Sequence, residues 1–189
     1  MGWRSPNYMY SHCQHPDMNL LLKNYKLSDD IAFRFSERTW ESWPLHAETF
    51  AHWVNNTAWN QEIINLFMDY ETFGEHQWEE SGIFEFMKEL PNQIINHSQF
   101  DFVTPSEASQ QLSPVSDIDI HHTISWADAE RDLTAWLGNP IQDDAFESLY
   151  KLEELVNKVT DSKIKDDWIK LQTSDHFYYM CTKFWSDGD

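Results

Sequence analysis

The sequence predicts an α/β protein in which about three parallel strands, joined by crossover helices, precede a helical segment. Two patterns support this prediction. Short apolar runs alternate with amphipathic helical stretches in the first part of the chain, an order typical of parallel strands with right-handed crossovers. After Pro114 the apolar residues follow almost only helical spacing. We therefore expect two parts, residues 1–115 and residues 116–189.

The strands of the first part are expected at residues 31–35, 63–68 and 100–103. The second of these, Ile-Ile-Asn-Leu-Phe-Met, is a nearly continuous apolar run, which indicates a strand buried on both faces. Residues 1–24 are expected to be irregular, because prolines and turn-forming residues interrupt them.

Helices are expected between and after these strands. In the first part they occupy residues 44–55, with proline in the first turn, and residues 79–90, where Pro91 should stop the helix. A third helix begins at Thr104-Pro105-Ser106-Glu107. The second part should contain an edge strand at residues 118–124. Helices should follow at residues 125–137, 140–159, 162–171 and 174–184.

The predicted sheet is incomplete. Three parallel strands flanked by helices leave two unpaired edges and cannot close into a barrel. No clear strand opens the chain, and no element closes the fold after Trp185. Either partner chains cover the edges, or the chain is a piece of a larger barrel protein. We favour the second interpretation.

The chain is strongly acidic, with 32 Asp+Glu against 13 Lys+Arg and a formal net charge of −19. This charge repels phosphate backbones and anionic lipid, so we expect neither nucleic acid nor a membrane as a partner. No apolar run approaches the roughly 18 residues of a membrane span. Cys13 and Cys181 suit a reducing cytosol, which predicts a cytoplasmic protein. Phosphate-binding and serine-hydrolase motifs are missing, and we expect no cofactor.

Aromatic residues are unusually frequent, with 10 Trp, 12 Phe and 7 Tyr. This is more aromatic surface than a core of this size requires. Indole faces that also offer an N–H suit pyranose rings, which present C–H faces edged by hydroxyls. The composition therefore favours a carbohydrate ligand without establishing one.

The densest group of chemically active residues follows the central strand. Because catalytic side chains collect at the carboxyl ends of parallel strands, we expect Asp69 to point into a cleft floored by apolar residues. Burial there would raise the pKa of its carboxyl, as a general acid near neutral pH requires. If the backbone stays extended through Tyr70, Glu71 lies on the same face and one charge helps to keep the other carboxyl protonated. His76 and Trp78 could supply a hydroxyl partner and a stacking platform.

Other interpretations of this group stay open at the level of the residues. The acids could simply cap the following helix while the aromatic side chains pack. Asp69, Glu71 and His76 could instead bind a metal ion, since two acids and one histidine suit a hydrolytic or iron site. Their spacing, however, matches no helical metal-binding motif.

Two later segments also combine aromatic and acidic side chains. Trp126 stands at a predicted helix start, where the helix dipole already explains the acids of the first turn. Asp175 and His176 stand beside three aromatic residues and fit a corner that grips a sugar. A helix capped by Ser174 explains the same segment more simply.

The segment Phe67–His76, with its D-x-E-x-F-G pattern, resembles the fourth conserved region of glycoside hydrolase family 57, a family of α-amylases and glucanotransferases. Similar stretches run essentially end to end, at 2–8, 25–35, 125–132 and 173–180. The resemblance implies a retaining α-glucan hydrolase or transglycosylase on a partial (β/α)7-type barrel, followed by an α-helical bundle segment. Residues 1–115 would then be part of the barrel, and residues 116–189 would complete the substrate cleft.

The resemblance also implies roles for individual residues. Asp69 matches the general acid/base of the family. Glu71 matches an acidic position of the substrate site, Trp126 falls in a region associated with substrate binding, and Asp175 matches a late Ser-Asp motif near the cleft. The residues expected to contact an α-glucan or maltooligosaccharide are Glu71, His76, Trp78, Trp126, Asp175 and His176.

Two regions of the family pattern are missing from the chain. A His-Gln-Pro region is not found, since Gln14-His15-Pro16 has a different order, and the region with the nucleophilic glutamate should lie upstream of Met1. Retaining hydrolysis needs two carboxyls about 5–5.5 Å apart. We therefore expect a fragment with little or no turnover alone, whose partner is the missing N-terminal half of the barrel. The alternatives are a non-catalytic glucan-binding module, or a metal-dependent hydrolase or deacetylase.

Overall fold

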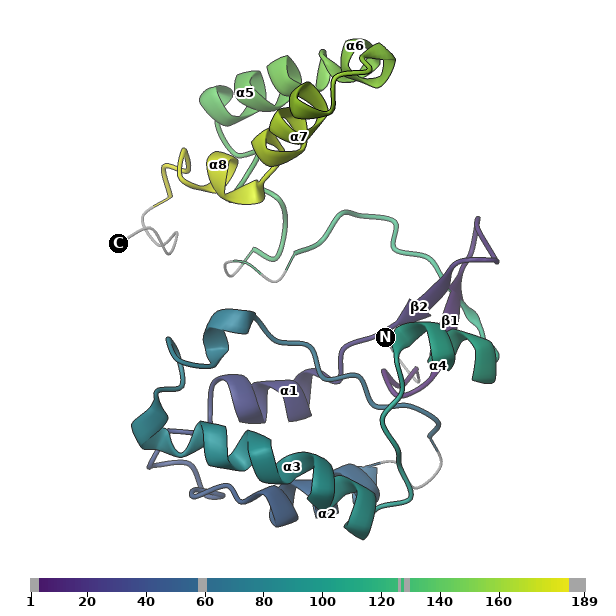
Figure 1. Cartoon of the computed structure of the whole chain (residues 1–189), viewed down its shortest axis with the longest axis vertical. Coiled ribbons are helices and arrows are strands. Elements are labelled where there is room, and N and C mark those ends of the chain that lie inside the picture. The colour runs from purple at the N-terminus through teal and green to yellow at the C-terminus, as the bar shows by residue number, and fades with distance from the viewer. Residues whose placement is uncertain (1–3, 58–60, 126, 128–129, 184–189) are drawn as a thin grey trace. The chain divides into compact units, whose positions relative to one another are not determined.

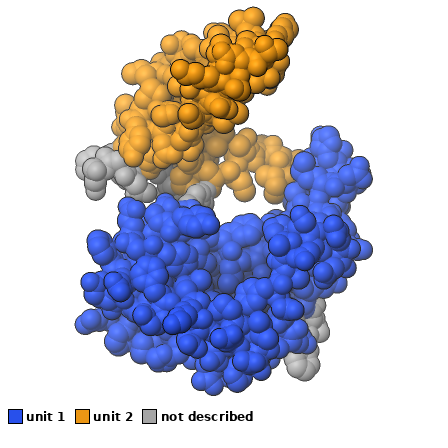
Figure 2. Space-filling model, in the orientation of Figure 1, with its two compact units in different colours: residues 1–119 blue, residues 120–189 orange. Residues whose placement is uncertain are grey.

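The computed structural model describes residues 4–57, 61–125, 127 and 130–183. These residues form a mixed α/β chain with a small sheet and several helices (Figure 1). The chain divides into two compact units, residues 1–119 and residues 120–189, coloured blue and orange in Figure 2. Across the described ranges, none of the helices has the length and apolarity needed to cross a membrane.

The first unit contains a three-stranded sheet that the sequence did not predict. Its strands are β1 (Met9–His12), β2 (Asn19–Leu21) and β3 (Asp117–Ile118), in the order β2-β1-β3. β1 pairs antiparallel with β2 and parallel with β3. The expectation of an irregular N-terminus is wrong, because Pro6 and Pro16 lie outside the paired residues and leave the strands free to bond.

The core of the first unit is helical. Helices α1 (Tyr25–Ala32), α2 (Ala47–Thr57) and α3 (Ile83–His97) contribute most of its buried side chains. α2 and α3 run side by side (Figure 1), and the rings of Phe50 and Phe86 meet edge to face at 5.8 Å between centroids. The helix predicted over residues 44–55 forms as α2, but it begins at Ala47, so Pro44 does not lie in its first turn as predicted.

The strand predicted at residues 31–35 is wrong, because helix α1 runs through Ala32 and the chain then turns over residues 33–36. Asn24 caps the helix by accepting a hydrogen bond from the backbone N–H of Leu27. Leu27, Ile31 and Phe35 then follow at helical spacing and are all buried. The turn-forming residues ahead of the predicted strand lie inside the helix, where Asp30 pairs with Arg34 at 2.7 Å.

Pro91 lies within helix α3 instead of ending it. A proline inside a helix removes one backbone hydrogen bond and clashes with the preceding turn, which favours a break. Here the apolar stripe continues past the proline, and both Leu90 and Ile94 are buried against the core. The packing of this stripe on both sides of Pro91 keeps the helix continuous.

The parallel strands predicted at residues 63–68 and 100–103 do not form within the described part of the chain. Both segments run without helix or sheet assignment, so the predicted set of three parallel strands with crossover helices is corrected to the small mixed sheet above. Two short 3-10 helices, η1 (Tyr70–Thr72) and η2 (Glu79–Ser81), lie between these two segments in the sequence. The helix predicted from Thr104 is confirmed as α4 (Pro105–Gln111).

The second unit contains helices α5 (Pro140–Tyr150), α6 (Glu153–Lys158), α7 (Ser162–Leu171) and α8 (Ser174–Tyr178). Its described residues before α5 form turns and irregular chain. The long helix predicted over residues 140–159 is broken into α5 and α6. The helix predicted at 162–171 is confirmed, and the one from Ser174 is shorter than predicted. Residues 118–124 contribute only the end of β3 to the sheet.

The segment predicted as a helix at residues 125–137 forms turns where it is described. The N–H groups of Trp136 and Leu137 both bond to the carbonyl of Leu133. Gly138 follows, and a Cβ there would stand 2.0 Å from the carbonyl oxygen of Thr134, so only glycine fits. Gln142 is fully buried and ties this segment to α8, because its amide nitrogen donates to the carbonyls of Ala135 and Phe177.

Thr104 and Glu107 form a capping box at the start of α4. The Thr104→Ala substitution removes the acceptor of the Glu107 N–H, and we expect it to lower the free energy of unfolding by about 1 kcal/mol. Hydrogen bonds from the Thr104 N–H and hydroxyl hold the pKa of Glu107 below its usual range. The charged box therefore stabilises α4 fully at pH values above the pKa that Glu107 has in the unfolded chain. This stabilisation is lost as the pH falls through the pKa that Glu107 has in the folded chain.

Urea denaturation of the wild type and the Thr104→Ala variant at several pH values measures this difference. It should shrink on acidification, whereas the exposed Ser106→Ala change in the same helix should have little effect at any pH. An equal loss for Thr104→Ala across the acid range would contradict a role for the Glu107 charge.

Candidate functional site

Residues 63–68 lead directly to Asp69 and behave like one strand of a sheet with only one neighbour. Their side chains alternate: Ile64, Leu66 and Met68 pack on the core cluster, while Ile63 and Asn65 are buried among other residues. We call residues 63–68 the strand-like segment. The burial on both faces that the apolar run predicted is present only in part, because Ile64, Leu66 and Met68 are half-buried and Phe67 is 48% exposed, and the paired strand does not form.

Backbone hydrogen bonds hold one edge of the strand-like segment. The N–H of Ile63 donates to the carbonyl of Asn7 at 3.2 Å, and the N–H of Asn24 donates to the carbonyl of Asn65 at 2.9 Å. The N–H of Phe67 donates to the hydroxyl of Ser28 at 3.1 Å. These bonds involve alternate residues of the segment, as along one edge of a β-strand.

Asn24 and Ser28 connect this edge to helix α1. Both side chains are buried, and Ser28 is 0% exposed. The Asn24 amide oxygen caps α1, and its nitrogen donates to the Asn7 side chain at 3.0 Å. The Ser28 hydroxyl donates to the Asn24 carbonyl at 2.7 Å and accepts from Phe67. The first turns of α1 therefore fix the direction in which the strand-like segment delivers Asp69.

Asp69 is exposed. Its backbone is extended, with φ −73° and ψ 152°, and its carbonyl accepts the N–H of Thr72 at 3.2 Å. The expectation that its carboxyl points into an apolar cleft is wrong for the described chain. The chain turns into η1 at Tyr70, so the condition under which Asp69 and Glu71 would share one face of a strand is not met.

Beyond Asp69 the chain folds into a tight loop whose interior is polar but buried. We call residues 69–78 the acid loop. The carbonyl of Glu71 accepts the N–H groups of Glu75 and His76, and the Gln77 N–H donates to the carbonyl of Thr72 at 2.8 Å. Gln77 is 2% exposed, and its amide nitrogen donates to the carbonyl of Ala32 at the end of α1. The loop is therefore fastened to the same helix as the strand-like segment.

The acid loop presents aromatic and acidic side chains to solvent. Tyr70 is 97% exposed and Trp78 is 64% exposed, far more than large apolar rings usually are. Glu71 and His76 are exposed as well. Chemically, the loop offers a carboxyl group on an anchored backbone and two exposed aromatic side chains, which suit contact with a polyhydroxylated ring.

The metal-binding interpretation of Asp69, Glu71 and His76 gains no support from the geometry. Within the residues that the structure covers, no three His, Cys, Asp or Glu side chains come together as a metal-binding group. These three residues are all described, so the loop does not gather them around one point.

The other predicted site residues belong to the second unit. Asp175 and His176 are exposed in the first turn of α8. The residue that precedes this helix is Thr173, whereas the sequence predicted Ser174 as its cap. The neighbouring Phe177 is buried against Phe146, at 5.8 Å between ring centroids. Trp126 lies outside the described residues.

Several residues that build the site were missed at the level of the sequence. Tyr70 was passed over although it follows Asp69 directly, and Gln77, Ser28 and Asn24 were not recognised as anchors. Asn65 carried the clearest signal, because a lone amide in an apolar run must find a hydrogen-bond partner when buried. Its side chain donates to the carbonyl of Leu22 at 3.0 Å.

The sequence is similar to a known family of proteins. The family model described as "Glycosyl hydrolase family 57" matches residues 1–121. A protein of Methanocaldococcus jannaschii named "Putative alpha-amylase" is 48% identical over 199 residues, covering 99% of this chain and 41% of the relative. No solved structure matches the chain.

The chain thus belongs to glycosyl hydrolase family 57. It spans about 41% of the length of the curated relative that it matches. Asp69 and the whole acid loop lie inside the region that the family model covers, whereas Asp175 and His176 lie outside it.

The Ser28→Ala substitution tests the anchoring of Asp69. It leaves the Phe67 N–H without its acceptor, and we expect the free energy of unfolding to fall by about 1–3 kcal/mol. Amide hydrogen exchange of the strand-like segment and the acid loop should accelerate together. The exposed Ser106→Ala variant is the control and should exchange like the wild type. Unchanged exchange of the strand-like segment in Ser28→Ala would contradict the role of α1 in holding it.

Proposed function

We propose that this chain supplies the general acid/base, Asp69, of a retaining α-glucan-active glycoside hydrolase or transglycosylase. In the first step the Asp69 carboxyl donates its proton to the leaving glycosidic oxygen as the bond from that oxygen to the anomeric carbon breaks. A carboxylate nucleophile attacks the same carbon and forms the glycosyl ester. In the second step the Asp69 carboxylate takes a proton from the incoming water or sugar hydroxyl, which displaces the nucleophile.

One observation carries the proposal most directly. Asp69 stands at the end of a segment whose backbone is fixed by Asn7, Asn24 and Ser28, and its carboxyl is open to a ligand. A general acid must be held within hydrogen-bond reach of its proton acceptor, so a fixed backbone at this position is the necessary first condition. Membership of the family supports the same role.

We further propose that the nucleophilic glutamate lies outside the chain. Residues 1–115 would then be part of a (β/α)7-type barrel, and its missing N-terminal half would be the partner that provides the second carboxyl. Residues 116–189 would form the helical part of the catalytic domain, with Asp175 and His176 contacting the glucan beside Trp126. The small fraction of the M. jannaschii relative that the chain spans supports this division.

The activity test uses the chain alone and the chain co-expressed with the unmatched part of the M. jannaschii relative. Alone, we expect negligible turnover of soluble starch, maltooligosaccharides and an activated aryl α-glucoside. The co-expressed pair should hydrolyse or transfer starch, and Asp69→Asn should lower kcat/KM about 100-fold or more, because general acid–base catalysis contributes on that scale.

The Glu75→Gln variant is the matched control, since Glu75 is another exposed acid of the same loop. It should keep nearly full activity. Robust turnover by the chain alone that disappears in Asp69→Asn would overturn the claim that the nucleophile lies elsewhere. Full activity of Asp69→Asn in the pair would overturn the acid/base assignment.

A second candidate function is glucan binding without catalysis, and the exposure of Tyr70 and Trp78 favours it. Stacking of sugar rings on open aromatic faces needs no second carboxyl. Tyr70→Ala and Trp78→Ala should each raise the dissociation constant for glycogen several-fold in affinity electrophoresis, because each removes a stacking surface.

Phe33→Ala is the control for this measurement, because Phe33 is also well exposed but lies outside the acid loop. Its mobility in glycogen gels should match that of the wild type. Mobility of the wild type that glycogen does not retard would argue against glucan binding by the chain alone.

A further inference from the structure

The strand-like segment has a second edge with which no described residue pairs by hydrogen bonds. The backbone N–H and carbonyl groups of Ile64, Leu66 and Met68 form no hydrogen bond with the described parts of the chain. They alternate with the residues that bond to Asn7, Asn24 and Ser28. The segment is therefore a strand paired along one edge and open along the other, and an open edge is a template for a further strand.

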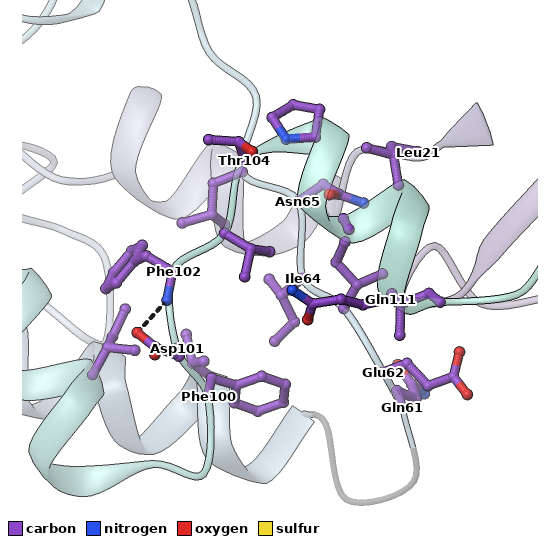
Figure 3. A pocket seen from close by; sticks show the side chains of 18 of the residues that line it. Leu21, Gln61, Glu62, Ile64, Asn65, Phe100, Asp101, Phe102, Thr104 and Gln111 are labelled. Atoms are coloured by element: carbon purple, nitrogen blue, oxygen red, sulfur yellow. Dashed lines mark hydrogen bonds between the residues drawn. The ribbon is translucent and has the colours of Figure 1, made fainter. Parts of the chain in front are cut away.

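A pocket of about 630 Å³ lies beside this segment (Figure 3). One wall consists of residues 61–67, and another consists of residues 99–105. Figure 3 shows Ile64 and Phe100 pointing into the space between these walls, with Gln111 of α4 at its side. The pocket therefore follows two stretches of chain instead of closing around a single point.

The second wall also has unpaired backbone groups. The N–H of Phe102 bonds only to the neighbouring Asp101 carboxylate at 2.7 Å, and the N–H groups of Asp101 and Val103 bond to no described residue. Phe102 is 55% exposed and Val103 is 45% exposed. Both walls thus combine apolar side chains with free backbone donors and acceptors, the combination that an added β-strand satisfies.

We propose that this pocket is the docking site for an extended polypeptide strand from the part of a family 57 catalytic domain that this chain does not contain. The strand would hydrogen-bond along the open edge of Ile64, Leu66 and Met68 and cover Phe102. This inference deepens the proposed function, on which it rests, by assigning a surface to the missing partner.

Two observations favour a polypeptide over a small ligand. Unpaired backbone groups stand in two runs along the walls, which an extended chain can match residue by residue, whereas a small-molecule site gathers a few polar side chains around one point. The chain also spans only 41% of the M. jannaschii relative, so most of that protein's chain is available to provide such a strand.

The test uses the full chain co-expressed with the unmatched part of the M. jannaschii relative. We expect a complex that copurifies, with hydrogen exchange at least tenfold slower at the amides of Ile64, Leu66 and Met68 than in the chain alone. Failure to copurify, or a complex without protection of these amides, would overturn the proposal.

Two matched variants locate the contact. Phe102→Asp places a charge in the pocket and should weaken the complex at least tenfold. The Phe33→Asp variant is the control, because Phe33 is also 55% exposed but lies outside the pocket, and the complex should stay intact in this variant. Equal binding by the Phe102→Asp variant and the wild type would place the partner elsewhere and overturn the assignment.

Further measurements distinguish the proposed partner from other occupants of the pocket, and the docking site from the proposed activity. Protection of the same amides in the concentrated chain alone, or by maltoheptaose, would show that a second copy or a glucan fills the pocket, and either result overturns the proposal. Protection in a complex without Asp69-dependent starch turnover supports the docking site and counts against the proposed function. Asp69-dependent starch turnover without protection of these amides supports the proposed function and counts against the docking site.

Discussion

The position of Asp69 depends on a small buried network between helix α1 and the strand-like segment. Asn24 and Ser28 each form hydrogen bonds that serve two elements. Some of these bonds cap or close the first turn of α1, and others hold the backbone at Asn65 or Phe67. Buried polar groups are costly unless paired, so these bonds form as a set. The helix and the approach to the acid loop are therefore one structural unit, and a change in either moves the other.

The acid loop separates its roles by burial. Thr72 and Gln77 are almost fully buried and fix the course of the chain, whereas Asp69, Tyr70 and Trp78 are exposed. Such a surface can meet a ligand, but an exposed carboxyl lacks the dry, preorganised surroundings that strengthen electrostatic catalysis. In the proposed assembly, the partner would provide those surroundings together with the second carboxyl, so catalysis and assembly would depend on the same event.

Local signals predicted some elements well and failed where partners from elsewhere in the chain decide the outcome. Thr104 and Glu107 act within one turn, and Pro140 follows a capping asparagine, so the starts of α4 and α5 could be predicted. The sheet could not, because β1 finds β3 more than a hundred residues later. Residues 63–68 show the intermediate case: their burial followed from composition, but pairing needs a second strand that the described chain does not bring to them.

The sequence by itself determined the D-x-E-x-F-G pattern, the likeness to family 57 and the high aromatic content, because these reside in residue identities and short spacings. Only the tertiary structure decided that Asp69 is exposed, that α1 replaces a predicted strand, and that one edge of residues 63–68 stays open. Exposure and pairing are properties of what surrounds a residue. Hydrogen bonds between distant segments, such as Ser28 to Phe67, set them, and no local pattern encodes those bonds.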